Sequence, residues 1–110
     1  MLGNMLENLP MANDKNHKSL LDDNNLIEEC FSEAEKGLSA GEVPVGCLFV
    51  CEDYDNGEPK WTVIAKAHNR SNEFQSALHH AEFDCVNQVI SRFGSQYRTV
   101  LERTTVLVSL

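Results

Sequence analysis

The apolar and polar positions separate a polar beginning from a longer part with regular periods. Residues 1–22 are rich in Asn, Asp, Lys and Met without a sustained period, which predicts a disordered extension. From residue 26 apolar side chains recur every three or four positions, so one face of a helix is apolar. That face comprises Leu26, Ile27, Cys30, Phe31, Ala34 and Leu38. Asp23, Asn24 and Asn25 are N-cap candidates, and Gly41 is a natural end for the helix.

Two β-branched and apolar runs follow this helix. Residues 43–51 open with Pro44 near their start and predict a first strand. The polar stretch 52–60 contains Asp55-Asn56-Gly57 and Pro59, which are typical turn residues. Residues 61–67 predict a second strand, so we expect an antiparallel hairpin with a long loop.

A second amphipathic helix is expected after a polar loop at 69–77, beginning near residues 78–80. Its apolar positions are Phe83, Val86, Val89, Ile90, Phe93 and Tyr97. Residues 104–110 are again β-branched and apolar and predict a third strand. The order helix, hairpin, helix, strand predicts an α/β fold with a mixed sheet.

Composition narrows the classes of function. The 110 residues suffice for one domain, and the formal net charge is −8. The nine Lys and Arg residues form no run, which argues against a chain that binds nucleic acid unaided. Four cysteines without a secretory leader favour a reducing, intracellular setting, and no segment is apolar enough to span a membrane.

The strongest chemical signal is His80-Ala81-Glu82, at the predicted start of the second helix. This is the first half of the H-x-E…P-C-x-x-C signature of zinc-dependent base deaminases. In that reading His80 is a zinc ligand and Glu82 moves protons. The alternative is that a chance H-x-E merely caps the helix or faces solvent. We expect His79 to face solvent, and Cys47, Cys51 and Cys85 to be buried by packing.

Several separate blocks occur in the order found in one family. They are Gly41-Glu42-Val43-Pro44-Val45-Gly46-Cys47, residues 63–65 leading to Asn69 and Asn72, residues 77–83, and residues 104–110. Over roughly residues 26–110 the chain closely resembles the tRNA-specific adenosine deaminases. It is most similar to the catalytic subunits of the eukaryotic heterodimeric members.

This resemblance implies a cytidine-deaminase-like α/β/α fold and conversion of adenosine to inosine at the tRNA wobble position. It implies that His80 binds Zn²⁺, that Glu82 shuttles protons, and that Asn69 and Val45 bind the substrate. Val45 and Gly46 would form a flat floor for a flipped-out base, or would simply pack the strand. The implied partners are tRNA and a catalytically inactive deaminase-like subunit, in the nucleus, the cytoplasm or both.

The chain also departs from the family pattern. Leu78 stands where the family usually has Thr, and residues 53–59 resemble a small loop insertion. The family continues with Glu-Pro-Cys-x-x-Cys, which carries two further zinc ligands on a third helix. We therefore expect residues 23–110 to be the N-terminal part of a deaminase domain that is incomplete at its C-terminus. The alternatives are an inactive truncated isoform that only binds the partner subunit, and a deaminase of free bases or nucleosides.

Overall fold

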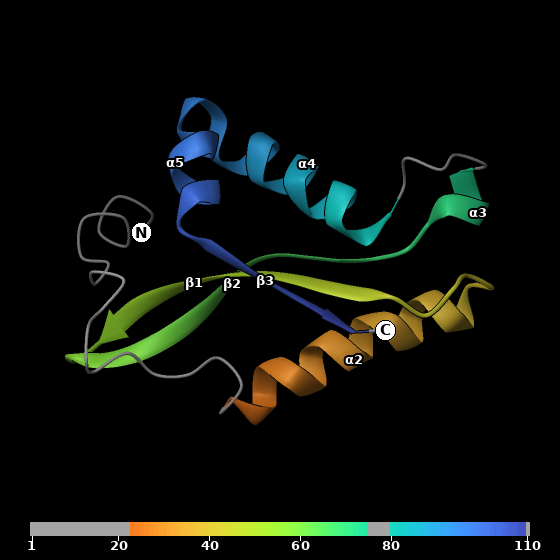
Figure 1. Ribbon diagram of the computed structural model, residues 1–110, viewed down its shortest axis with the longest axis horizontal. Coiled ribbons are helices and arrows are strands. Elements are labelled where there is room, and N and C mark those ends of the chain that lie inside the picture. Colours follow the sequence, from red (N-terminus) through yellow and green to blue (C-terminus); the bar gives the residue numbers. More distant parts are fainter. Residues whose placement is uncertain (1–22, 75–79, 110) are drawn as a thin grey trace.

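The computed structural model describes residues 23–74 and 80–109 (Figure 1). The predicted extension over 1–22, the departure at Leu78 and the predicted exposure of His79 lie outside these residues. Of the helices in the described part, none is long and apolar enough to cross a membrane.

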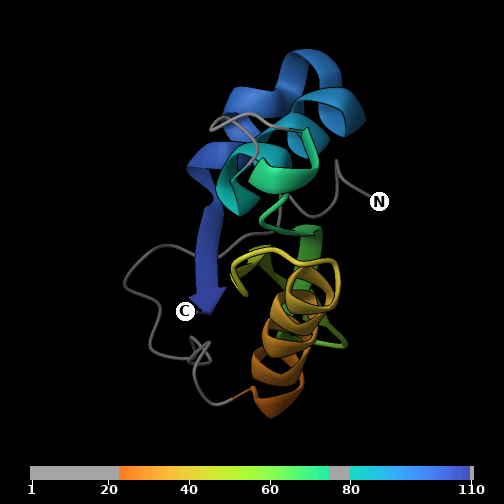
Figure 2. The ribbon, with the colours of Figure 1, turned by 90° about the vertical axis from the view of Figure 1, so that its right-hand side faces the viewer.

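Three layers form the fold. The central sheet has the strand order β2-β1-β3, with β1 at Gly46–Asp55, β2 at Glu58–His68 and β3 at Thr104–Ser109. One helix, α2 (Asn24–Ser39), lies on one side, and α4 (Ala81–Phe93) and α5 (Tyr97–Glu102) lie on the other (Figures 1 and 2). Two short elements, α3 (Ser71–Phe74) and the 3-10 helix η2 (Gly94–Gln96), complete it. The expected α/β class is confirmed.

Both strand pairs are antiparallel. The parallel pair that a mixed sheet needs is therefore not among the described strands. Between Phe49 and Val50 the register of β1 with β2 shifts, because Phe49 pairs with Ala65 and Val50 with Val63. Ile64 is the extra residue of this bulge, which lets Ile64 and Ala65 both face the same side of the sheet.

The alternation of side chains along β1 divides the core in two. The cluster on the α4 side contains Cys47, Phe49, Cys51, Ile64, Ala65, Ala67, Ala81, Cys85, Val89 and Val100. The cluster on the α2 side contains Leu26, Cys30, Leu48, Val50 and Trp61. β1 is therefore buried on both faces, which explains why it reads as a continuous apolar run.

The first helix begins as predicted, because the Asp23 carboxylate accepts a hydrogen bond from the Leu26 N–H at 3.2 Å. Its apolar face is narrower than predicted. Leu26, Cys30 and Ala34 are buried, whereas Phe31 is 53% exposed and Leu38 is 61% exposed.

The long hairpin loop was a wrong prediction. Both strands continue through the polar stretch to a two-residue turn at Asn56 and Gly57, whose φ angles are 52° and 81°. Positive φ at both positions is the geometry of a type I′ turn, which suits the twist of a hairpin. Pro59 lies within β2, an edge strand, where a missing N–H is tolerated.

The second helix is shorter than predicted. It ends at Phe93, because Gly94 has a φ of 55° that interrupts the helical path. Tyr97 instead begins α5, which the sequence did not predict. Phe83 and Ile90 are each 42% exposed, so only part of the apolar stripe faces the sheet.

Candidate functional site

The His-Ala-Glu motif lies at the N-terminus of α4, as predicted. His80 is the N-cap residue, with extended backbone and no capping hydrogen bond from its side chain. Glu82 lies in the first helical turn, and both side chains are exposed. The N-terminus of a helix has free N–H groups and the positive end of the dipole, which stabilise negative charge. An exposed imidazole and an exposed carboxylate thus lie two residues apart at an electropositive helix end.

The two predicted substrate-binding residues come from different segments and are joined directly. Asn69 follows the last residue of β2, and its N–H donates to the Val45 carbonyl at 3.1 Å. The Asn69 side-chain oxygen accepts from the Ser71 N–H at 3.0 Å and from the Ser71 hydroxyl at 2.7 Å. Asn69 is 7% exposed and Val45 is half-buried.

Glu42 and Asn72 hold the same two segments together, and the sequence reasoning assigned neither a role. Glu42 is 4% exposed, and its carboxylate accepts from the Asn72 N–H at 3.0 Å. The Asn72 side-chain amide donates to the Gly41 carbonyl at 3.3 Å. Both residues lie inside the sequence blocks that resemble the family. Their polar side chains, in two segments that flank strand ends, were the sequence feature that could have pointed to a role.

These parts meet at one end of the molecule. The N-terminus of α4, α3 and the segment before β1 all lie at the end where β1 begins and β2 finishes (Figures 1 and 2). Val45 packs against the core cluster that contains Ala81, the central residue of the His-Ala-Glu motif. The motif and the Asn69–Val45 pair therefore adjoin the same core cluster.

Gly46 has a structural reason to be glycine. A Cβ there would lie 2.2 Å from the Cys30 carbonyl oxygen and 2.7 Å from the Ala34 nitrogen. Both atoms belong to the backbone of α2, so the missing side chain lets this helix approach the strand. Gly46 is therefore explained by packing, because the space left by its missing Cβ is filled by α2 and is not open to a base.

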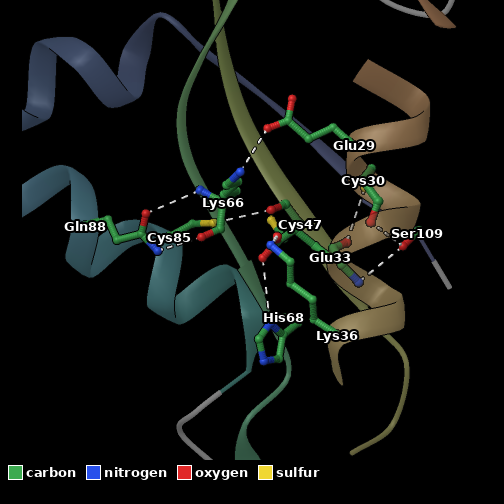
Figure 3. A network of polar contacts seen from close by, with 11 residues as sticks. Glu29, Cys30, Glu33, Lys36, Cys47, Lys66, His68, Cys85, Gln88 and Ser109 are labelled. Atoms are coloured by element: carbon green, nitrogen blue, oxygen red, sulfur yellow. Dashed lines mark hydrogen bonds and ion pairs between the residues drawn. The ribbon is translucent and has the colours of Figure 1, made fainter. Parts of the chain in front are cut away.

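All four cysteines are buried, as predicted. The Cys85 thiol donates to the Cys47 carbonyl at 3.7 Å (Figure 3). Burial raises the pKa of the Cys30 and Cys51 thiols, and the hydrogen bond to Cys47 together with burial raises the pKa of Cys85. These neutral thiols are packing groups.

A buried carboxylate ties α2 to the end of β2. Glu33 is 4% exposed, and its oxygens lie 2.5 Å from the Lys36 nitrogen and 3.6 Å from His68 Nδ1 (Figure 3). Because His68 immediately precedes Asn69, Glu33 lies beside the strand end from which the Asn69 loop departs.

The described residues alone do not form a complete metal centre. Among residues 23–74 and 80–109 there is no group of three His, Cys, Asp or Glu side chains that could hold a metal ion. Catalytic zinc requires three protein ligands and a water. His80 fits as one of the three, because its imidazole is exposed and forms no capping bond.

The comparison with family models decides the family. Residues 21–110 match the cytidine and deoxycytidylate deaminase zinc-binding region. The chain belongs to the cytidine and deoxycytidylate deaminase family. This deaminase chain is 35% identical over 89 residues to the tRNA-specific adenosine deaminase 2 of Xenopus tropicalis, covering 78% of the chain and 48% of the relative. It is 32% identical over 77 residues to a tRNA-specific adenosine deaminase of Streptococcus pyogenes, covering 70% and 43%. The deaminase chain thus spans less than half the length of these relatives.

A solved structure supports the fold of this deaminase chain. It belongs to biochemical and structural studies of A-to-I editing by tRNA:A34 deaminases at the wobble position of transfer RNA. The likeness has a TM-score of 0.59 at 24% identity and covers 77% of this chain and 57% of that chain. The cytidine-deaminase-like fold implied by the sequence resemblance is therefore confirmed.

Proposed function

We propose that this chain is the N-terminal part of a zinc-dependent tRNA adenosine deaminase that produces inosine at the wobble position. The observation that carries the proposal is the His80-x-Glu82 pair at the N-terminus of α4, at the same end as the Asn69–Val45 pair. The names of the curated relatives support tRNA adenosine as the substrate. The matched segments span less than half the length of those relatives, so the activity of the whole protein is part of the proposal.

The proposed reaction is hydrolytic: water and adenosine give inosine and ammonia. His80 supplies one zinc ligand, and a Pro-Cys-x-x-Cys segment outside residues 1–110 supplies the other two. Zinc, when bound, lowers the pKa of its water to about 7. Glu82 takes the proton of the attacking water, passes it to a ring nitrogen and assists the departure of ammonia.

The substrate and the partner are proposed from the family resemblance, and the charge of the chain is compatible with both. Asn69 and Val45 contact the base, which must leave the anticodon stack to reach the site. A net charge of −8 gives this chain little attraction for a phosphate backbone. The family resemblance implies a heterodimer, and we propose that a catalytically inactive deaminase-like subunit contributes to tRNA binding, in the nucleus, the cytoplasm or both.

The test uses the full-length protein purified with its partner subunit, and compares Glu82→Ala with Glu28→Ala. Glu28 is an exposed carboxylate on α2, at a distance from the motif, and serves as the matched control. Inosine in tRNA and bound zinc are both measured. Glu82→Ala should abolish inosine formation and keep its zinc, because this carboxylate is not a ligand, whereas Glu28→Ala should behave as the parent.

Other outcomes separate the alternatives. Undiminished turnover by Glu82→Ala would overturn the role of this residue. Conversion of free adenosine or guanine in place of tRNA would identify a deaminase of free bases or nucleosides. Copurification with the partner subunit without zinc and without activity would identify a chain that only binds the partner.

A further inference from the structure

We propose that Ser71, Glu42 and Asn72 are positioning residues that fix the Asn69 amide with its NH₂ group directed to the substrate. The inference rests on the proposed function, because it takes the Asn69 amide as a contact to the target base. It adds which end of that amide recognises the base, and which neighbours hold it. The ligand group would be an acceptor nitrogen of a purine ring.

Ser71 decides the orientation of the amide. A backbone N–H can only donate, so the Asn69 atom 3.0 Å from the Ser71 nitrogen must be the oxygen. The Ser71 hydroxyl donates to the same oxygen at 2.7 Å. With both bonds on the oxygen, the other end of the amide is the NH₂ group. That group has no hydrogen-bond partner within the described parts of the chain.

An Asn side chain that presents NH₂ offers two donors and no acceptor. Adenine carries unprotonated acceptor nitrogens at N3 and N7 besides the N1 that takes the proton in the reaction. The geometry therefore selects a ring acceptor over the exocyclic amine, which is a donor. This selection would be lost if the amide could rotate by half a turn.

Two loops form a clasp that keeps Ser71 in place. We define the clasp as residues 41–45 together with residues 69–72. Three hydrogen bonds cross it: Asn69 N–H to the Val45 carbonyl, Asn72 N–H to Glu42, and the Asn72 side chain to the Gly41 carbonyl. The bond to the buried carboxylate is charge-assisted and so is among the stronger ones.

The clasp is anchored in the body of the fold. The Glu42 N–H donates to the Gly37 carbonyl at 2.9 Å, near the C-terminal end of α2. The Asn69 loop departs from His68 at the end of β2, which pairs with Gly46. The position of the Asn69 amide is thus set by α2, β1 and β2, and Ser71 sets its rotation.

The purely structural alternative is that Asn69 and Ser71 form a common Asx turn that opens α3. Stability alone cannot distinguish the two roles, since both predict some loss when Ser71 is changed. Discrimination between substrate analogues does distinguish them, because a residue that only supports the fold has no preference for one ring nitrogen.

The experiment uses full-length protein with its partner and anticodon stem–loops carrying adenosine, 3-deazaadenosine or 7-deazaadenosine at the target position. Values of kcat and KM are measured for the parent, Ser71→Ala, Ser71→Thr and Glu42→Gln. Ser95→Ala, an exposed serine in η2, is the matched control. The parent should lose roughly tenfold in kcat/KM with one deaza analogue, the size of one hydrogen bond.

Ser71→Ala should reduce that discrimination, mainly through KM, and Ser71→Thr should restore it because the hydroxyl is retained. Glu42→Gln should fall between them, and Ser95→Ala should match the parent. A parent enzyme that converts no adenosine would refute the proposed function. An active parent without discrimination, or Ser71→Ala with undiminished discrimination, would overturn this inference and leave the proposed function intact.

Discussion

Replacing Gly46 with alanine would place a methyl group where the structure has no room for one. The new Cβ would lie 2.2 Å from the Cys30 oxygen and 2.7 Å from the Ala34 nitrogen. Carbon–oxygen contacts are comfortable at about 3.3–3.6 Å, so α2 and β1 would have to separate by roughly 1 Å. Neither neighbouring atom can rotate away, because both belong to the helix backbone.

The magnitude follows from this rigidity. Overpacking of a close-packed interior typically costs about 1–3 kcal/mol, and rigid neighbours place Gly46→Ala at or above the upper end. Alanine has less conformational freedom than glycine in the unfolded chain, which stabilises the folded state by about 0.4–1 kcal/mol and offsets part of this cost. We expect a net loss of about 2–3 kcal/mol in the free energy of unfolding. That is a large part of the total for a domain, about 5–15 kcal/mol, and lowers Tm by roughly 10–20 °C.

Urea unfolding followed by far-ultraviolet circular dichroism measures this loss, with Gly37→Ala as the control. Gly37 lies inside α2, and a Cβ there would meet its nearest neighbour, His68 Cβ, at 3.4 Å. Alanine at that position should be neutral or stabilise by up to about 1 kcal/mol, through helix propensity. The steric argument would be refuted if Gly46→Ala unfolded at the same urea concentration as the parent.

Three further predictions concern the thiols, a sheet edge and the metal. The pKa values of Cys30, Cys51 and Cys85 in the folded protein lie above the ordinary value of 9.0. Their contribution to stability is therefore full below pH 9.0 and is lost as the pH rises from there through the folded pKa values. The free energy of unfolding measured from pH 7 to 10.5 should decline above pH 9, and a flat profile would contradict this prediction. Gln88→Ala should increase self-association measured by light scattering, because the Gln88 amide covers the Lys66 N–H and carbonyl on the outer edge of β2 at 3.3 and 2.7 Å; the exposed Asn87→Ala is its control. His80→Ala in the full-length protein should lose bound zinc and, with it, thermal stability; retention of stoichiometric zinc would exclude His80 as a ligand.

Short-range sequence patterns predicted several features correctly. The N-cap at Asp23, the apolar run of β1 and the position of His80 at a helix start all followed from short-range patterns. The α/β/α layers followed from the family resemblance, since element order alone does not say which helix covers which face.

The errors arose where polar residues form regular structure or apolar residues remain outside the core. The polar character of residues 52–60 predicts a loop, yet the two strands pair through this stretch up to the turn at Asn56 and Gly57. The turn itself was predicted correctly. The apolar spacing continues across Gly94 to Tyr97, so the predicted helix merges α5 with α4.

Part of the candidate site could not be predicted from sequence. His80, Glu82, Asn69 and Val45 were identified by motif and resemblance. Glu42 was missed, because a buried carboxylate that binds a backbone N–H thirty positions away is defined only by tertiary structure.

The turn at Asn56 and Gly57 lies at the far end of the two strands whose other end carries the Asn69–Val45 pair. Strands of ten residues at about 3.3 Å per residue place the turn roughly 30 Å from that pair. A fluorophore or an affinity tag inserted between Asn56 and Gly57 would thus be a handle remote from the chemistry. Its signal could follow folding and assembly of the protein while substrate is turned over at the opposite end.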